Sequence, residues 1–157
     1  MISIQPITIR VGGPQDAAFI EALGKRTVMD SVPSTRNAQA RDVLGSYKRL
    51  LDIVEKQSHR IFIAQRGSAP IGFLLAVDDL ADEVTGEPQR FIAYIAVEPA
   101  QRQQGVGALL MAAAEDDARE RGLPYITLMV TDENHAARGL YDRAGFVTER
   151  RLLCKPL

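Results

Sequence analysis

Cysteine and histidine are scarce in this chain of 157 residues, which has one cysteine, two histidines and no tryptophan. A single cysteine, Cys154, excludes an internal disulfide and a multi-cysteine zinc site. The two histidines, His59 and His135, do not form a ligand-spaced cluster with it. We therefore expect neither a structural nor a catalytic metal ion.

Long apolar runs and an excess of one charge are also missing. Nineteen basic and twenty acidic side chains leave a formal net charge of −1, without the basic surplus typical of nucleic-acid-binding proteins. The N-terminus lacks the basic stretch and apolar core of a signal peptide, and no apolar run approaches the ~20 residues that span a bilayer. The sequence predicts a cytoplasmic protein that binds neither nucleic acid nor membrane.

The length and the order of the elements predict one α/β domain over residues 1–157. A hydrophobic content of 46% suffices for one packed core, and the chain is too short for two ordinary domains. Strand-like runs occur at 7–12, 60–65, 69–78, 90–97, 125–130 and 146–154. Helical periodicity occurs at 14–26, 37–57, 104–121 and 134–144. This order indicates a mixed sheet flanked by helices.

Three features of the expected surface and core have two interpretations each. The acidic turn with Asp78, Asp79, Asp82, Glu83 and Glu87 is typical of a solubilising hairpin loop, although it could also attract a cationic substrate. Cys154, in an apolar strand without an evident histidine partner, is expected to be a buried structural thiol rather than an acyl acceptor. Asp117 and its acidic neighbours are expected on the wet face of the long helix.

A glycine-rich turn joins the strand at 90–97 to the next helix. Pro99 ends the strand, and Gly105 and Gly107 lie at the first turn of the helix. Such a turn leaves backbone N–H groups uncovered at the positive end of the helix dipole, where an anion can approach closely. The spacing matches neither a P-loop nor a Gly-x-Gly-x-x-Gly fingerprint. On this evidence alone, phosphate binding and close helix packing both remain open.

Two motifs in this half of the chain resemble those of the GCN5-related N-acetyltransferase (GNAT) superfamily. The first is the acyl-coenzyme A pyrophosphate loop, Val97-x-Pro99-x-x-Arg102-x-x-Gly105-x-Gly107. The second is Asn134-x-x-Ala137-x-x-Leu140-Tyr141-x-x-x-Gly145-Phe146. Two motifs in the right order are far more specific than either alone. The resemblance covers residues 61–150 well and the N-terminal part more loosely.

The resemblance implies a mostly antiparallel sheet whose strands splay apart at an acetyl-CoA site. Amides from Gln103 to Gly107 would cradle the diphosphate, with Arg102 nearby unless it is only a solvated arginine. Strand backbone around Ile95 and Val97 would pair with the pantetheine arm, and an N–H there would polarise the thioester carbonyl. The implied cofactor-binding residues are Ile95, Ala96, Val97, Arg102, Gln103, Gln104, Gly105, Val106, Gly107, Asn134, Ala137 and Tyr141.

The second motif also has a purely structural interpretation. Asn134 fits a helix N-cap, and Ala137 and Tyr141 lie on one apolar face. Tyr141 is then a core residue whose hydroxyl finds some partner. The resemblance instead makes Tyr141 the general acid that protonates the departing thiolate, and it places Asn134 against the pantetheine.

The general base is not evident. The family often carries a glutamate on one of the two strands that here run over 90–97 and 125–130, and neither has a carboxylate. Glu98 is a weak candidate beside the loop. The other acids in flanking turns are Glu87, Asp132 and Glu133. All four are expected to be solvated surface charges, and removal of the proton through water is an equal alternative.

The resemblance therefore implies an N-acetyltransferase that moves an acetyl group from acetyl-CoA to a primary amine of a small molecule, peptide or protein. The acceptor would bind between residues 14–57 and the turn at 79–89. A non-catalytic acyl-CoA-binding or sensing module of the same fold is the alternative, and a nucleotide-binding α/β protein is a more distant one. A homodimer through the last strand or the helices is compatible with the sequence, although no residue requires it.

Overall fold

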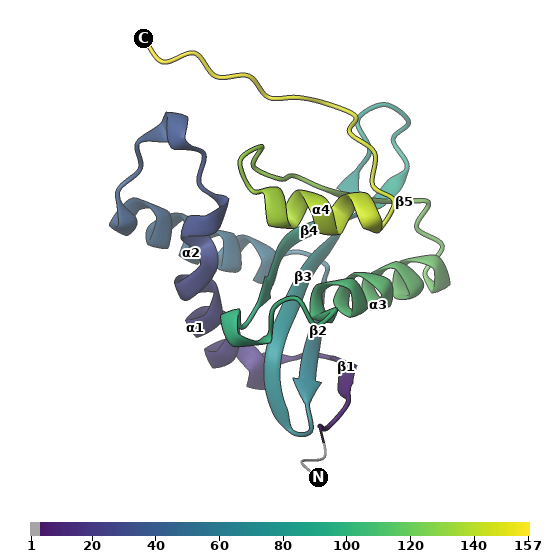
Figure 1. Cartoon of the computed structure of the whole chain (residues 1–157). Coiled ribbons are helices and arrows are strands. Elements are labelled where there is room, and N and C mark those ends of the chain that lie inside the picture. Colours follow the sequence, from purple (N-terminus) through teal and green to yellow (C-terminus); the bar gives the residue numbers. More distant parts are fainter. Residues whose placement is uncertain (1–3) are drawn as a thin grey trace.

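The computed structural model describes residues 4–157 and places five strands in one sheet (Figure 1). The strands are β1 (Ile7–Val11), β2 (His59–Arg66), β3 (Ala69–Ala81), β4 (Pro88–Val97) and β5 (Tyr125–Leu128). They lie side by side in sequence order. Neighbouring strands from β1 to β4 are antiparallel, and β5 pairs with β4 in parallel. The expected mixed, mostly antiparallel sheet is confirmed.

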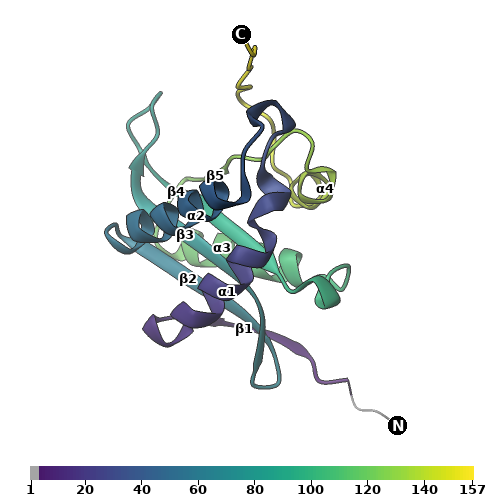
Figure 2. The same ribbon diagram turned by 90° about the vertical axis from the view of Figure 1, so that its left-hand side faces the viewer.

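Four helices cover the two faces of this sheet (Figure 2). They are α1 (Ala17–Thr27), α2 (Ala40–Glu55), α3 (Val106–Glu120) and α4 (His135–Arg143). α1 and α2 cover one face, and α3 and α4 lie on the other. The expected loop at 27–36 contains two short 3₁₀ turns, η2 (Val28–Ser31) and η3 (Ser34–Arg36). In the described part of the chain, no helix has the length and apolar character needed to cross a membrane.

The core lies on both faces of β3. Leu74 and Ala76 pack towards α3 and α4, whereas Phe73 and Leu75 pack towards α1 and α2. All four side chains are buried. A strand covered on both faces reads as a continuous apolar run, because alternate side chains enter different cores.

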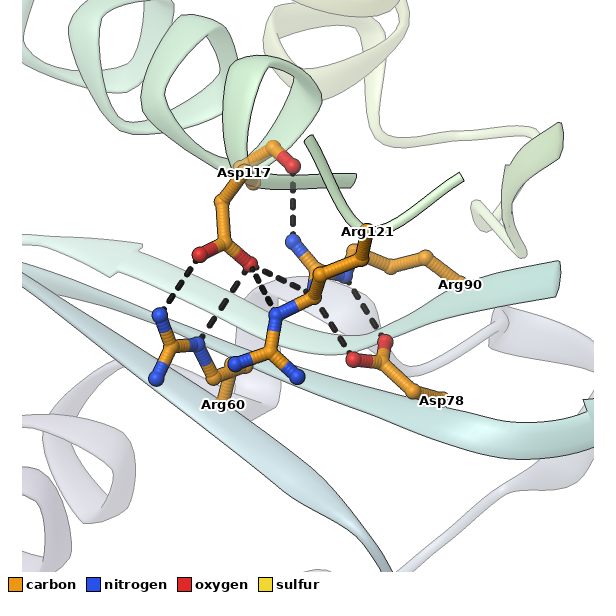
Figure 3. Close-up of polar contacts among 6 residues, drawn as sticks. Arg60, Asp78, Arg90, Asp117 and Arg121 are labelled. Carbon is orange, nitrogen blue, oxygen red and sulfur yellow. Dashed lines mark hydrogen bonds and ion pairs between the residues drawn. The ribbon is translucent and has the colours of Figure 1, made fainter. Parts of the chain in front are cut away.

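A buried ion-pair network ties α3 to the sheet (Figure 3). Arg90 on β4 has no exposed surface, and its guanidinium donates to both carboxylate oxygens of Asp78 at 2.8 and 2.7 Å. It also donates to Asp117 Oδ2 and to the carbonyl oxygen of Ala114, both at 2.7 Å. Arg60 binds the other oxygen of Asp117 at 2.6 Å. The network holds α3, and so the loop in front of it, at a fixed place on the sheet.

The expectation that Asp117 lies on a wet helix face is wrong. Its side chain is only 14% exposed, and three arginines reach it: Arg60, Arg90 and Arg121. Burial raises the pKa of Asp117, but the hydrogen bonds from Arg60 and Arg90 outweigh that effect, so its net pKa lies below the ordinary value. Asp78, expected in a solubilising turn, lies in the same network with its side chain 9% exposed.

The expected last strand at 146–154 does not form. Phe146 is held by a 3.0 Å hydrogen bond from its N–H to the carbonyl oxygen of Tyr141, and every residue after it is exposed. The segment runs away from the sheet in both views (Figures 1 and 2). Cys154 is exposed as well, so its assignment as a buried thiol is wrong. The segment has a strand-like sequence but pairs with no strand among residues 4–157.

Candidate active site

The parallel pair β4 and β5 separates halfway along β4. Pairing runs from Gln89 with Tyr125 to Ile92 with Leu128, where β5 ends. β4 continues to Val97, still paired with β3 on its other side. A bulge in the β3–β4 register at Ala93 lies at the point of separation. Residues 93–97 therefore present one edge of backbone without a strand partner.

The direction of the amides along this open edge follows from one hydrogen bond. The N–H of Glu98 donates to the carbonyl oxygen of Ile71 on β3 at 2.8 Å. Because successive amides of a strand point to opposite edges, those of Ile95 and Val97 point to the open edge. The amide of Ala96 points back to β3. Of the three strand residues predicted for acyl-CoA binding, two thus offer free N–H groups.

The loop after β4 has the backbone shape of an anion-binding concavity. After the 3₁₀ turn η4 (Pro99–Gln101), Gln103 and Gly105 both adopt left-handed conformations, with φ of 62° and 80°. Gly105 is the N-cap of α3, and no side chain caps the first turn. An uncapped helix start leaves backbone N–H groups free to bind an anion. Nothing lies within 4 Å of a Cβ built on Gly105, so the approach is open.

Arg66, at the end of β2, braces this loop. Its guanidinium donates to the side-chain oxygens of Gln104 at 2.7 Å and Gln101 at 3.4 Å. Arg102 is half-exposed and pairs with Asp30 of η2 at 3.3 Å. The predicted cationic side chain therefore lies at the loop, next to the η2 segment.

Gly107 serves packing as well as the loop. A Cβ at this position would lie 3.0 Å from Leu140 Cδ2 on α4, closer than side chains ordinarily pack. Close helix packing, one of the two sequence interpretations, thus holds for Gly107, while Gly105 remains open to a ligand. The contact brings α4 against the N-terminal end of α3.

Asn134 is the N-cap of α4, as the structural interpretation predicts. Its Oδ1 accepts a hydrogen bond from the N–H of Ala137 at 3.2 Å. Ala137 and Leu140 pack against the same core cluster as Ile95, Val97 and Val106. The cap therefore fixes the helix that carries Tyr141 beside the open edge of β4.

Tyr141 is buried in this cluster, yet its hydroxyl is free. The side chain is 8% exposed, and its ring packs edge-on against Phe146 with centroids 5.8 Å apart. No residue of the described range 4–157 hydrogen-bonds to the hydroxyl, which is also not among the fully enclosed polar atoms. Burial, with a smaller effect of Tyr94, raises the pKa of Tyr141 to about 12. The phenol is protonated at neutral pH and available to a ligand.

The four acids predicted as weak base candidates are all engaged or remote. Both carboxylate oxygens of Glu98 accept from Arg26, at 2.6 and 2.7 Å, and this contact lowers the pKa of Glu98. Asp132 pairs with Arg138 at 3.1 Å. Glu133 accepts from Ser34 at 3.0 Å. Glu87 precedes β4 at the end opposite to the open edge.

Sequence reasoning missed a polar group on the α1 side of β4. The hydroxyl of Tyr94 lies 2.9 Å from Oγ1 of Thr27, and burial raises the pKa of Tyr94. The charges of Asp30 and Arg102 also act on this phenol. The bulge at Ala93 turns two successive side chains towards α1 and α2. A tyrosine within an apolar strand was the only sequence signal.

The turns η2 and η3, which follow α1, contact the loop before α4 on this side of the site. Thr131 donates to the carbonyl oxygen of Ser31, and Glu133 holds Ser34, so η2 and η3 contact the loop before α4. A mostly apolar hollow of about 320 Å³ lies between these turns and the start of α2. Its polar lining residues include Ser31, Arg36 and Asp42. The hollow is open to solvent, and its lining residues all lie between positions 28 and 46, within the N-terminal segment that is predicted to lie on the acceptor side.

Comparison with known proteins gives the same family as the motifs. The model of the acetyltransferase (GNAT) family matches residues 29–146. An uncharacterized N-acetyltransferase of Bacillus subtilis (strain 168), YhfO, is 30% identical over 108 residues, which are 69% of this chain and 72% of YhfO. A mycothiol acetyltransferase of Thermobifida fusca (strain YX) is 36% identical over 69 residues, which are 44% of this chain. This chain matches only 21% of that relative's length.

A solved structure extends the likeness over nearly the whole chain. A protein from Pyrococcus furiosus that is assigned as an acetyl transferase superposes with a TM-score of 0.81 at 24% identity. The match covers 97% of this chain and 100% of that one. At this identity the likeness shows the fold alone. The family match and YhfO establish that this chain belongs to the acetyltransferase (GNAT) family, a family of acetyl-CoA-dependent N-acetyltransferases.

Proposed function

We propose that this chain transfers the acetyl group of acetyl-CoA to a primary amine by direct attack, without a covalent enzyme intermediate. The observation that carries the proposal is the open edge of β4 beyond Ile92, with the free hydroxyl of Tyr141 beside it. An edge of unpaired amides needs a partner, and the amide groups of a pantetheine arm are complementary to it.

The chain's own groups account for the binding of the diphosphate and the pantetheine arm of acetyl-CoA. Amides from Gln103 to Gly107 bind the diphosphate at the start of α3, and Arg102 adds a positive charge nearby. The N–H groups of Ile95 and Val97 bind the pantetheine, and one of them polarises the thioester carbonyl as its oxygen gains negative charge. Asn134 acts indirectly, because its side chain caps α4 and so positions Tyr141.

Tyr141 assists cleavage of the C–S bond of the thioester. The amine nitrogen attacks the acetyl carbon, the sulfur leaves as a thiolate, and the phenol of Tyr141 donates to that sulfur. Complete transfer from a phenol of pKa about 12 to a thiolate of pKa about 8.5 is uphill by ~3.5 units, or ~5 kcal/mol. The phenol therefore acts mainly as a hydrogen-bond donor, and the proton lost by the attacking amine completes the balance.

We assign no carboxylate as general base, although members of the family often carry a glutamate for this role. Glu98 is occupied by Arg26, so the acceptor loses its proton to water. Deprotonation of a lysine amine of pKa ~10.4 costs about 4.6 kcal/mol at pH 7, whereas deprotonation of an α-amine near pKa 8 costs about 1.4 kcal/mol. Amines of low basicity are accordingly the better acceptors.

The pH dependence of kcat/KM should follow the acceptor rather than the enzyme. We expect one rising limb that levels near the acceptor's own pKa, since neither Glu98, with its lowered pKa, nor Tyr141, near 12, titrates in the usual assay range. Profiles for an α-amine and for a lysine ε-amine should differ by ~2 units in the position of this limb. The profile of Glu98→Gln should overlay that of the wild type. If the rising limb instead levels at the same pH for both acceptors, and if it is absent in Glu98→Gln, Glu98 is the base.

The function itself is tested by thiol release from acetyl-CoA with a panel of amines. The panel contains free amino acids, peptides with varied N-termini, polyamines and aminoglycosides. We expect amine-dependent release, and mass spectrometry should show an acetylated acceptor. Calorimetry measures CoA binding in parallel. Tight CoA binding without turnover of any amine would favour the sensing module, and competition by ATP or NAD with no CoA binding would favour a nucleotide-binding protein.

A further inference from the structure

The loop after β4 contains one strained residue. Gln103 has a left-handed backbone with φ of 62°, although it is not a glycine. Within residues 4–157 the only other non-glycine residue with positive φ is Asn37, and asparagine tolerates this conformation better than most residues. A left-handed residue with a Cβ persists only where its surroundings hold it. Contacts around Gln103 must therefore keep the loop in this shape.

One arginine holds the residues on both sides of Gln103. The Nε–H of Arg66 donates to Oε1 of Gln101 at 3.4 Å, and its Nη2 donates to Oε1 of Gln104 at 2.7 Å. Gln101 is the last residue of η4, and Gln104 directly precedes Gly105, the N-cap of α3. A change of the backbone angles at Gln103 would move these two glutamines relative to each other. It would break at least one of the two hydrogen bonds, so Arg66 opposes it.

Arg66 is itself fixed at the end of β2. Its backbone lies in the sheet, opposite Ile7 of β1 and Ala69 of β3. Its Nη1 donates to the carbonyl oxygen of Gln5 at 2.7 Å. The side chain of Gln5 lies against the hairpin turn, where a Cβ on Gly67 would collide with it. The guanidinium is thus oriented from three sides, and its plane turns only if it loses one of these acceptors.

The acceptors of Arg66 carry no charge. Two are side-chain amide oxygens, and the third is a backbone carbonyl oxygen. Bracing of the loop uses the planar fork of the guanidinium, whereas its positive charge would attract a diphosphate without that geometry. The two effects can be separated, because Arg66→Lys keeps the charge and loses the fork.

We propose that Arg66 is a positioning residue for acetyl-CoA. It holds the loop in the shape that presents the amides of residues 103–107 to the diphosphate, and it acts through Gln101 and Gln104 without touching the cofactor. The inference rests on the proposed binding of the diphosphate by those amides. A loop that is ordered before the ligand arrives loses less conformational entropy on binding, so it binds the ligand more tightly. Arg66 lies 35 positions before Gln101, outside both sequence motifs.

Calorimetry with CoA tests the proposal without depending on turnover. We expect Arg66→Met to bind CoA about 10-fold more weakly than the wild type, a factor that corresponds to ~1.4 kcal/mol, the order of the cost of one left-handed residue. Dephospho-CoA, which lacks the 3′-phosphate but keeps the diphosphate, should lose affinity by the same factor. In steady-state assays the KM for acetyl-CoA should rise by this factor, while kcat should stay within about twofold of the wild type.

Arg10→Met is the matched control. Arg10 is a partly exposed arginine on the neighbouring strand β1, and it also donates to a glutamine side chain, that of Gln65 at 2.9 Å. Its ion pair is with Asp16, and it lies at the opposite end of β1 from Ile7, which faces Arg66. Loss of Arg10 should therefore lower stability without changing the affinity for CoA.

Two further variants separate bracing from charge. Arg66→Lys keeps the positive charge, but one ammonium group cannot reproduce the fork that holds both glutamines, so we expect a loss close to that of Arg66→Met. Gln103→Gly removes the strain, because glycine adopts positive φ without a steric cost. Added to Arg66→Met, it should regain about threefold of the lost affinity, which is about half of the loss in free energy.

Several results would overturn the proposal. Wild-type affinity for CoA in Arg66→Met would show that the loop keeps its shape without Arg66. Full affinity in Arg66→Lys would reduce the role of Arg66 to its charge. A loss with CoA but not with dephospho-CoA would mean that Arg66 binds the 3′-phosphate directly. A wild type that binds no CoA would refute the proposed function itself, so the two failures are distinguishable.

Far-UV circular dichroism of each variant checks that the fold is retained. If Arg66→Met does not fold, Gln104→Leu takes its place, because it removes the shorter of the two glutamine hydrogen bonds and leaves β2 unchanged. We expect Gln104→Leu to weaken binding of CoA and of dephospho-CoA by the same factor. Wild-type affinity in that variant would equally overturn the bracing role.

Discussion

The Tyr141→Phe variant is expected to lose about 100- to 1,000-fold in kcat while keeping the wild-type affinity for CoA. Phenylalanine retains the ring that packs against Phe146 and the core cluster, so the fold and the binding edge stay in place. Only the hydroxyl is lost. Because that hydroxyl makes no hydrogen bond within the described chain, its removal breaks no structural contact.

Initial rates of thiol release measure the loss of kcat, and calorimetry measures the affinity for CoA. Tyr125→Phe is the control, since Tyr125 is a 45% exposed tyrosine at the far end of β5, and it should turn over like the wild type. Tyr94→Phe separates the two phenols near the site. Wild-type turnover in Tyr141→Phe together with a large loss in Tyr94→Phe would instead assign to Tyr94 the role of hydrogen-bond donor to the leaving sulfur.

Much of the fold could be predicted because local patterns and core burial agree. The helical spacing at 37–57 and the apolar strand at 90–97 both correspond to elements of the structure. The motif around Gly105 predicted a glycine-rich turn at the start of a helix, and Gln103 and Gly105 adopt left-handed conformations just before α3. In these segments each side chain's position follows from its immediate neighbours along the chain.

The features that sequence reasoning missed depend on contacts between distant segments. Glu98 looked like a free acid beside the loop, but its partner Arg26 lies 72 positions away. The bulge at Ala93 comes from the register with β3, which no pattern within the strand reveals. The segment at 146–154 is strand-like, yet a strand needs an edge to pair with, and this chain does not bring its own edge to that segment.

Arg90→Met is expected to destabilise the protein by about 3–5 kcal/mol, the usual result of removing one partner from a buried ion pair. The substitution leaves the carboxylate of Asp78 without its two donors and the carbonyl of Ala114 without its hydrogen bond. Asp117 loses one of three arginines. At ~2–4 °C per kcal/mol, the thermal midpoint should fall by at least about 6 °C. Chemical denaturation and differential scanning calorimetry measure both quantities.

Arg119→Met is the matched control for this prediction, because Arg119 lies on α3, the helix that Arg90 contacts, and pairs with Glu115 and Asp116 at the surface. Its cost should stay within about 0.5 kcal/mol. Adding Asp78→Asn to Arg90→Met removes the charge left without a partner, and the double variant should regain part of the loss. A free energy of unfolding for Arg90→Met no lower than that of Arg119→Met would mean that packing, and not this network, holds α3 and the acyl-CoA loop on the sheet.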